Sequence, residues 1–209
     1  SHPCILGSRV HISRMQGWEK LNETFENRTC EVNIAIVGKY VKLTDSYKSL
    51  NEALEHAGLF NNTRVNRVYV DADTLESKDD ISEHFRNIHG ILIPGGFGER
   101  GVEGKIKAAE YARTHGIPYF GICLGMQLAV VEYARHICGI ENANSSEFDE
   151  KTKNPVIDFL PEQRKIKRKG GTMRLGAYRC TLSDNTNAHR AYGAAEISER
   201  HRHRYEFNP

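Results

Sequence analysis

The sequence lacks any long apolar run: no stretch approaches the roughly 18 apolar residues that a membrane-spanning helix needs. Cysteine is scarce, with five residues in 209, and no two of them form a Cys-x-x-Cys pair, which argues against a disulfide framework and a cysteine-rich metal site. Charge of one sign is not in excess, since the formal net charge is +2, so nothing points to nucleic acid as a partner. These absences favour a protein of the reducing cytoplasm that binds neither membranes nor nucleic acids.

Short apolar runs alternate with segments of helical spacing along most of the chain. The runs predict strands, at residues 32–37, 67–73, 90–94 and 119–122, the last of them buried. The helical segments are at residues 46–57, 78–87 and 104–115, and from Leu124 onward. Gly58 is expected to end the first of these helices. Such alternation predicts an α/β fold with a mostly parallel, twisted sheet flanked by helices.

The two ends of the chain differ from this pattern. Residues 1–30 are polar and irregular, and they predict a linker or peripheral segment in which Trp18 is the only large anchor. The region after about residue 140 instead contains short extended segments, at 156–160, 178–182 and 199–208. We therefore expect strands of antiparallel character in the C-terminal part of a single domain that spans residues 31–209.

Cys123 stands where the last predicted strand meets a helix. The run Gly121-Ile-Cys-Leu-Gly125 has the spacing of a strand-to-helix nucleophile elbow, with cysteine as the nucleophile. The free N–H groups and partial positive charge of the helix N-terminus are expected to favour the thiolate. Further along this mostly apolar helix, Glu132, Arg135 and His136 predict one narrow charged face. The alternative is an inert cysteine that happens to end a strand.

A second glycine-rich segment points to the same crevice. Gly95 and Gly96 follow the strand at 90–94, and ligands of parallel sheets bind beyond the carboxyl ends of the strands. Because glycine has no Cβ, the backbone N–H of this pair can approach a ligand closely. Together with the N–H of Leu124, it would form an oxyanion hole for acyl transfer. An ordinary strand-to-helix turn is the alternative.

Three further features suit a polar ligand. Gln127 lies one helical turn after Cys123 and needs a partner, either a substrate or the backbone. Glu147 stands in an otherwise uncharged loop, where it would take a substrate ammonium group or remain solvated. In Arg200-His-Arg-His-Arg204, an extended strand would put the arginines on one face, suited to carboxylate or phosphate. The two histidines on the other face lack a third ligand, so we expect no metal site.

Several motifs carry a resemblance to a known family. They are Gly38-Lys-Tyr, Asp45-Ser-Tyr47, Pro94-Gly-Gly-Phe-Gly98, Arg100-Gly-Val-Glu-Gly104, Gly121-Ile-Cys-Leu-Gly-Met-Gln127, Glu141-Asn-Ala-Asn-Ser-Ser-Glu-Phe148, Gly170-Gly-Thr-Met-Arg-Leu-Gly176 and Glu199-Arg-His-Arg-His-Arg-Tyr-Glu206. Over residues 30–209 the chain resembles the flavodoxin-like class I glutamine amidotransferase domain of CTP synthases. The glutamate loop and the Arg-His-Arg-His-Arg-Tyr run narrow the resemblance from the superfamily to this family.

The resemblance implies a role for each site residue. Cys123 would attack the side-chain amide of glutamine, and the backbone N–H groups of Gly96 and Leu124 would hold the oxyanion. The amino-acid end of glutamine would be held by Gln127, Glu147, Arg204 and the backbone of Tyr205. Phe97 and Arg202 would lie near the site of GTP, which activates this family.

The resemblance also implies partners. Ammonia would pass to a synthetase domain that uses ATP and Mg²⁺ to convert UTP to CTP, in an enzyme that forms homotetramers, whereas the glutaminase domain itself would need no cofactor. Residues 1–30 do not resemble a synthetase domain, and the family's His-Pro-Glu segment is not found before Pro209. We therefore expect the sequence to be C-terminally incomplete and inactive by itself. A non-catalytic glutamine- or nucleotide-binding or assembly module, and another cysteine hydrolase, are the alternatives.

Overall fold

A parallel sheet forms the centre of the molecule. The computed structural model describes residues 15–39, 44–159, 176–201 and 203–209. The sheet has four strands in the order β2-β1-β3-β4, and all neighbouring pairs are parallel. Its strands are β1 (Cys30–Gly38), β2 (Thr63–Asp71), β3 (Gly90–Ile93) and β4 (Tyr119–Gly121). The predicted α/β fold with a mostly parallel sheet is therefore confirmed.

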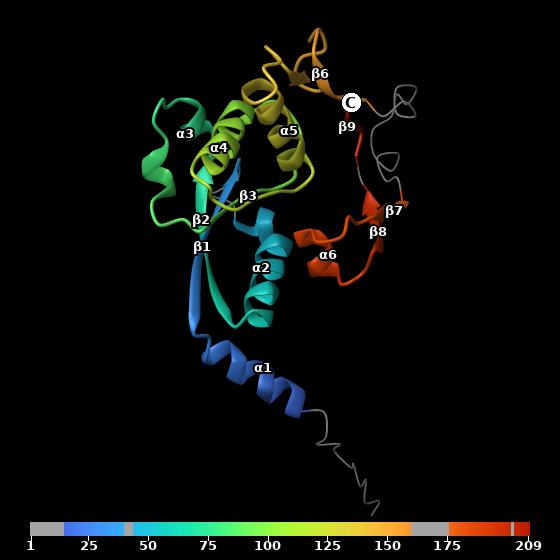
Figure 1. The fold of residues 1–209 in the computed structure, drawn as a ribbon. Coiled ribbons are helices and arrows are strands. Elements are labelled where there is room, and N and C mark those ends of the chain that lie inside the picture. Colours follow the sequence, from blue (N-terminus) through green and yellow to red (C-terminus); the bar gives the residue numbers. More distant parts are fainter. Residues whose placement is uncertain (1–14, 40–43, 160–175, 202) are drawn as a thin grey trace, which may run out of the picture.

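Helices connect the parallel strands, because a parallel pair needs a crossover. The α-helices are α1 (Gln16–Glu26), α2 (Lys48–Phe60), α3 (Ala72–Glu76), α4 (Val102–Thr114), α5 (Leu124–His136) and α6 (Asn187–Tyr192). The 3₁₀-helices are η2 (Thr44–Tyr47) and η3 (Ser82–Phe85). The chain moves outward from β1 to β2 and, in the other direction, from β3 to β4, so right-handed crossovers place α2 and α4 on opposite faces. Figure 1 shows α3, α4 and α5 grouped together, with α2 apart from them.

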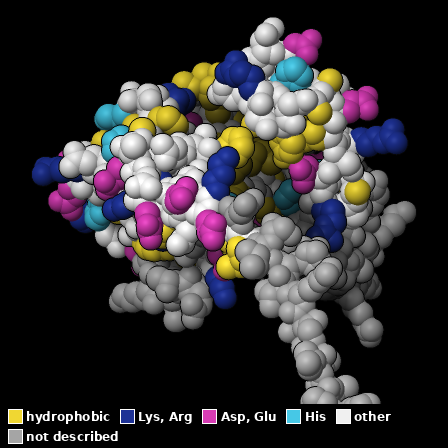
Figure 2. All heavy atoms as spheres, turned by 90° about the horizontal axis from the view of Figure 1, so that it is seen from below, with side chains coloured by type: hydrophobic (Ala, Val, Ile, Leu, Met, Phe, Trp, Pro, Cys, Tyr) yellow, Lys and Arg dark blue, Asp and Glu magenta, His cyan; other side chains and the backbone are white. Residues whose placement is uncertain are grey.

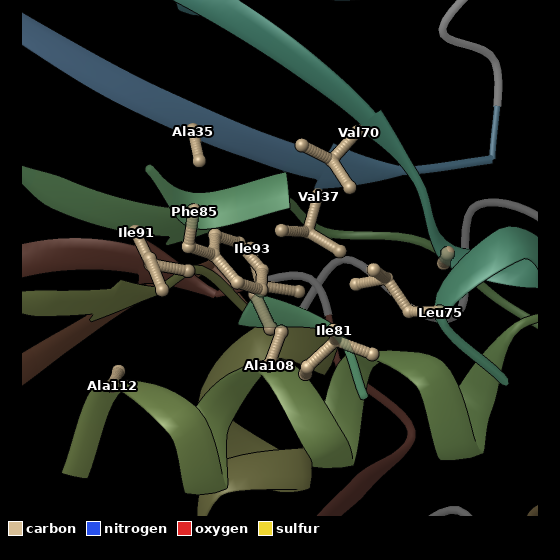
Figure 3. Packing of buried hydrophobic residues seen from close by; sticks show 11 residues of the cluster. Ala35, Val37, Val70, Leu75, Ile81, Phe85, Ile91, Ile93, Ala108 and Ala112 are labelled. Atoms are coloured by element: carbon tan, nitrogen blue, oxygen red, sulfur yellow. The ribbon is translucent and has the colours of Figure 1, made fainter. Parts of the chain in front are cut away.

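The main core lies between the sheet and α4. Val37 of β1 and Ile91 and Ile93 of β3 direct their side chains toward Ala108 and Ala112 of α4 (Figure 3). All four residues of β3 are buried, as expected for a central strand of a parallel sheet. A second cluster joins Val102 and Ile106 to residues of α5, and it fixes α5 against α4.

Several element boundaries differ from those predicted. The strand predicted at residues 67–73 ends at Asp71, whose carboxylate accepts a hydrogen bond from the N–H of Asp73 at 3.0 Å and begins α3. The helix predicted at residues 78–87 is only the 3₁₀-helix η3. Gly58 does not end α2; it is buried inside the helix, where a Cβ would lie 2.5 Å from the carbonyl oxygen of Thr63. That glycine therefore allows the helix to pack closely on β2. In the sequence, a glycine so near the end of a helix looks like a C-cap.

Two hydrophobic residues are more exposed than predicted. β4 was expected to be buried, but it is an edge strand of the sheet, and Phe120 is 65% exposed. Trp18 was expected to anchor the first 30 residues, but it is 69% exposed on α1. The N-terminal segment also contains a helix where irregular chain was predicted, and its first 14 residues lie outside the described part of the chain.

The C-terminal part forms two small sheets. β5 (Asn144–Ser145) pairs parallel with β6 (Pro155–Phe159), which pairs antiparallel with β9 (Tyr205–Phe207). β7 (Gly176–Thr181) and β8 (Glu196–His201) form an antiparallel ribbon. The antiparallel strands are confirmed, but the single strand predicted at residues 199–208 is two strands in different sheets. Arg200 and His201 therefore lie in β8, whereas His203 and Arg204 precede β9, so these four side chains do not share the two faces of one strand.

The surface carries mixed charge. On the face seen in Figure 2, Lys and Arg side chains lie among Asp and Glu side chains and form no single basic patch. Within the described ranges, no helix combines the length and the apolar character that crossing a membrane requires.

Candidate active site

Cys123 lies between β4 and α5 in a tight turn. Its backbone has φ 53° and ψ −106°, a left-handed conformation that is uncommon for a side-chain-bearing residue. The N–H of Ile122 donates to the carbonyl of Ile93 at 2.9 Å, which joins the turn to the end of β3. The N–H of Gln127 donates to the carbonyl of Cys123 at 3.1 Å and begins α5. The sequence expectation of a strand-to-helix elbow is confirmed.

The two flanking glycines are required by close backbone contacts. A Cβ on Gly121 would overlap the backbone of Gly125 and Met126. A Cβ on Gly125 would overlap the carbonyl oxygen of Ile93. The hydroxyl of Tyr119 donates to the carbonyl of Gly125 at 2.6 Å and ties the first turn of α5 to β4. The elbow is thus a packed junction of β3, β4 and α5.

The sulfur of Cys123 lies against two backbone donors. The backbone N–H groups of Leu124 and Gly96 lie close enough to the sulfur to lower the pKa of the thiol. A Cβ on Gly95 would stand 3.3 Å from the Cβ of Cys123, so the glycine pair approaches the thiol closely. The structure therefore brings together the segments after β3 and β4 that the sequence placed in one crevice.

The protonation of Cys123 differs from the expectation. Burial raises the pKa of the thiol above its ordinary value, and the nearby negative charge of Glu147 raises it further. The N–H groups of Leu124 and Gly96 lower the pKa but do not reverse the shift. The amide at the helix N-terminus favours the thiolate, as predicted, but burial outweighs it, so the net shift of the pKa is upward.

Glu147 lies between the thiol and the glycine-rich loop. It is half-buried, and its Oε1 accepts a hydrogen bond from the N–H of Gly98 at 3.1 Å. A backbone hydrogen bond fixes Glu147 in its loop: the N–H of Glu147 donates to Oγ of the buried Ser145 at 3.1 Å. Burial raises the pKa of Tyr205, and the charge of Glu147 raises it further. The carboxylate of Glu147 is therefore close enough to influence both Cys123 and Tyr205.

Gln127 and Arg204 complete the site from two directions. Gln127 is buried, and its Nε2 donates to the carbonyl of Tyr205 at 2.9 Å, which settles its partner as backbone. The guanidinium of Arg204 lies over the ring of Phe159, with Cζ 4.9 Å from the ring centroid. The Nε of Arg204 is buried, and within the described residues it has no hydrogen-bond partner. A buried donor without a partner is costly, so this atom is suited to a ligand oxygen.

Comparison with known proteins decides the family. The model of the class-I glutamine amidotransferases matches residues 42–209. A CTP synthase of Syntrophus aciditrophicus is 59% identical over 194 residues, which are 93% of this chain and 36% of that protein. A CTP synthase of Geobacter sulfurreducens is 65% identical over 178 residues, which are 85% of this chain and 33% of that protein.

A solved structure, the glutaminase domain of Trypanosoma brucei CTPS with bound acivicin, is similar to the chain with a TM-score of 0.76 and 38% identity. The match covers 85% of this chain and 68% of that one. The chain belongs to the class I glutamine amidotransferases, as a CTP synthase glutaminase domain. The chain spans about a third of the length of the curated relatives that it matches. For the first of them, the matched part is 36% of the relative.

The two remaining site predictions for this glutaminase domain are only partly placed. The side chain of Phe97 is 55% exposed next to the glycine pair. Arg202 lies outside the described residues. The rings of His201 and His203 lie 5.4 Å apart, and burial lowers the pKa of His203. Within the described ranges, no histidine side chain hydrogen-bonds to Cys123.

A possible metal-binding group lies away from the elbow. Glu110, Glu132 and His136 each offer an atom within 4.8 Å of the others. Glu132 was expected on a charged face but is buried, and Arg113 donates to its carboxylate from Nε at 3.1 Å and from a terminal nitrogen at 2.7 Å. Because an arginine already neutralises that carboxylate, the group gives no reason to place a metal ion there.

Two lysines beside the glycine-rich loop were not predicted as site residues. Lys39, directly after β1, donates from Nζ to the carbonyls of Phe97 at 2.8 Å and Gly98 at 3.0 Å. Lys105 of α4 is 2% exposed, and burial lowers its pKa to about 8, with the charge of Lys39 contributing. Lys39 follows a strand that ends in glycine and therefore lies at the carboxyl edge of the sheet, where ligands bind. That position could have identified it as a site residue from the sequence.

Proposed function

We propose that this glutaminase domain hydrolyses L-glutamine to L-glutamate and ammonia at Cys123. The observation that carries the proposal is the pair of backbone N–H groups, from Gly96 and Leu124, aimed at the cysteine sulfur. An oxyanion formed beside that sulfur would be bonded by the same two donors. Backbone donors on a packed turn need no rearrangement when charge develops on the oxygen.

The reaction would proceed in two stages. In the first, the thiolate adds to the amide carbon, the C–S bond forms, and the carbonyl oxygen takes the negative charge. The C–N bond then breaks as the nitrogen gains a proton, so that ammonia leaves a glutamyl thioester. In the second, water adds to the thioester, the C–S bond breaks, and glutamate and the free thiol are released.

The amino-acid end of glutamine would be held opposite the elbow. Glu147 would take the ammonium group, and Arg204 would take the carboxylate with its buried, unpartnered Nε. Tyr205 would contribute its backbone, and Gln127 would hold that backbone in place through its 2.9 Å hydrogen bond.

The need for a proton acceptor at Cys123 supports a second candidate function for this chain when it acts alone. The thiol pKa is raised, and within the described ranges no histidine hydrogen-bonds to Cys123. Turnover therefore needs a proton acceptor beyond the described contacts of the thiol. Without it, the chain would act as a glutamine-binding module that forms covalent adducts with electrophiles and does not turn over.

The relatives are named CTP synthases, and the matched residues make up only 36% of their length, which supports a wider proposal. Ammonia from Cys123 would pass to a synthetase domain that aminates UTP to CTP with ATP and Mg²⁺. GTP would activate the reaction from a site near Phe97 and Arg202, and the enzyme would be a homotetramer. The described cysteines, which are free, suit a reducing cytoplasmic compartment.

Labelling with acivicin, an electrophilic amino acid, tests the proposal. The expected result is one adduct on Cys123, found by mass spectrometry of peptides, with protection by L-glutamine and none by D-glutamine. Cys30, Cys138 and Cys180 are exposed and serve as internal controls, because accessibility alone would favour them. A Cys123→Ser variant is expected to take no label. Modification confined to the exposed cysteines would refute the proposal.

Binding and turnover are then separated by two measurements. Calorimetry with L-glutamine on Cys123→Ala reports binding without chemistry. Ammonia release from the wild-type chain reports hydrolysis. Binding without release identifies the glutamine-binding module, and turnover of ester substrates with no glutamine binding identifies another cysteine hydrolase.

A further inference from the structure

One peptide unit of the glycine-rich loop is held at both ends by charged side chains. The carbonyl of Phe97 accepts a hydrogen bond from Nζ of Lys39 at 2.8 Å. The N–H of Gly98, in the same peptide unit, donates to Oε1 of Glu147 at 3.1 Å. Lys39 also reaches the next carbonyl, that of Gly98, at 3.0 Å. An ammonium and a carboxylate therefore fix this peptide from opposite sides.

Among the described residues, few other contacts hold the loop. Gly95, Gly96 and Gly98 have wide backbone freedom, and Gly98 has φ +78°. The side chain of Phe97 is 55% exposed and so provides no buried anchor. The neighbouring buried lysine, Lys105, donates to the carbonyl of Arg100 at 3.5 Å and, within the described ranges, to none of the loop glycines. The charge-assisted hydrogen bonds of Lys39 and Glu147 are therefore the main restraints on the loop.

The restrained Phe97–Gly98 peptide lies two peptide units after the Gly95–Gly96 peptide, whose N–H faces the thiol. The N–H of Gly96 lies close to the sulfur of Cys123, and the carbonyl that Lys39 holds belongs to the next residue. Because only the Gly96–Phe97 peptide separates the two, a displacement of the Phe97–Gly98 peptide would be passed on to the Gly96 N–H and move it from the position of an oxyanion. Misplacement of an oxyanion donor by about 1 Å is enough to slow catalysis strongly.

We propose that Lys39 is a positioning residue, which holds the glycine-rich loop so that the Gly96 N–H stays aligned with Cys123. The expected effect of Lys39 on catalysis rests on the proposed function. The expected effect of Lys39 on the loop rests on the hydrogen bonds alone. Glu147 also gains a second role besides ammonium recognition, because one of its oxygens anchors the same peptide.

The chain offers a matched control for Lys39. Nζ of Lys107 also donates to backbone carbonyls, those of Glu76 at 2.9 Å and Lys78 at 2.8 Å, after the end of α3. Lys107→Met therefore removes a comparable set of bonds away from the elbow. Lys39→Met removes the charge at similar length, and Lys39→Arg retains a donor.

The first measurement is the labelling of Cys123 by 6-diazo-5-oxo-L-norleucine, whose ketone oxygen takes the place of the amide oxygen of glutamine. The sulfur bonds to the terminal carbon, dinitrogen leaves, and the thiol proton goes to that carbon. Lys39→Met is expected to lower the maximal rate about 10- to 100-fold, with the half-saturating concentration changed less than about threefold. Lys39→Arg is expected to restore most of the rate, and Lys107→Met to leave it unchanged.

The second measurement needs no reaction at Cys123. Amide hydrogen exchange at Gly96 and Gly98 is expected to be about tenfold faster in Lys39→Met and unchanged in Lys107→Met. Labelling by iodoacetamide needs no oxyanion donor, and at a pH high enough to ionise the thiol in every variant its rate should be the same in all of them. Unchanged exchange in Lys39→Met, or equal loss of labelling in Lys107→Met, overturns the proposal. A wild-type chain that takes no amino-acid label refutes the proposed function, and exchange still decides the role of Lys39.

Discussion

The elbow and the opposite wall of the site are built in different ways. Cys123 is held by a junction of β3, β4 and α5 in which backbone atoms leave no room for a Cβ at Gly121 or Gly125. Tyr205 begins the three-residue strand β9, at the edge of a small sheet, and Arg204 directly precedes it. The strongest link that we find between the two walls is the 2.9 Å hydrogen bond from Gln127 to the carbonyl of Tyr205.

This difference separates chemistry from recognition. The groups that would stabilise the transition state are backbone donors on the packed side, where small displacements are resisted. The groups that would bind the amino-acid end stand on short elements, which open locally at low free energy. The site therefore combines a fixed reaction centre with a wall that is easier to rearrange when glutamine binds.

The largest expected effect comes from filling the space at the elbow. Gly125→Ala places a Cβ on the carbonyl oxygen of Ile93, so we expect a loss of about 3 kcal/mol or more in the free energy of unfolding, measured by urea denaturation. Gly17→Ala is the control, since nothing lies within 4 Å of its Cβ and it stands in α1. That change is expected to stabilise by up to ~1 kcal/mol. A stable Gly125→Ala variant would contradict the packed junction.

A smaller effect is expected at the link between the two walls. Gln127→Met keeps the volume of the side chain and leaves the carbonyl of Tyr205 without its donor. We expect glutamine affinity, measured by calorimetry, to fall about tenfold, because a lost buried hydrogen bond is worth ~1–3 kcal/mol. The rate of alkylation of Cys123 by iodoacetamide should not change.

The control for that variant lies on the same sheet. Asn208→Ala removes a hydrogen bond from the side chain to the carbonyl of Pro155, 2.7 Å long, at the end of β9. It is expected to leave glutamine affinity unchanged. Equal losses in both variants would show that the whole sheet, and not the Gln127 link, determines binding.

The pH dependence of Cys123 gives a still smaller effect. Because burial and Glu147 raise the thiol pKa, alkylation by iodoacetamide should increase with pH up to values above the ordinary titration range of cysteine. Glu147→Gln removes the negative charge, so the midpoint of the pH profile should move to lower pH. Glu150→Gln, which changes an exposed carboxylate of the same loop, should not move it. A midpoint that rises in Glu147→Gln would contradict the charge effect.

The smallest effect is expected where the end of α6 contacts the β7–β8 ribbon. Tyr192→Phe removes a hydrogen bond from the hydroxyl to Glu199 at 2.9 Å, where both residues are exposed. The free energy of unfolding should change by less than ~0.5 kcal/mol. Thermal unfolding followed by circular dichroism measures this, and a loss above 1 kcal/mol would show that the ribbon supports the domain more than its exposure indicates.

The parts of the site that sequence predicted are those fixed by local spacing. A glycine two residues before and after Cys123 specifies the elbow, because the turn closes within a few residues. The strand-to-glycine pattern at Gly95 also specifies its place, because parallel strands end at one edge. Neither inference needs knowledge of distant contacts.

The parts that sequence missed depend on partners far along the chain. Glu132 fits a charged helix face until Arg113, 19 residues earlier, packs against it. The run from Glu199 to Phe207 alternates like one strand, but β9 pairs with β6 and β8 with β7. The sign of the thiol pKa shift likewise depends on burial by the assembled fold, which outweighs the helix N-terminus.

The positive φ of Cys123 has an evolutionary consequence. A residue with a side chain in this conformation costs about 1–3 kcal/mol of backbone strain, which glycine avoids. Glycine at position 123 should therefore be more stable than alanine there, the reverse of the usual order of these two residues. If random substitutions were selected for stability alone, cysteine at this position would be replaced by glycine. If cysteine is retained at this position, selection for catalysis must outweigh the stability that glycine would add.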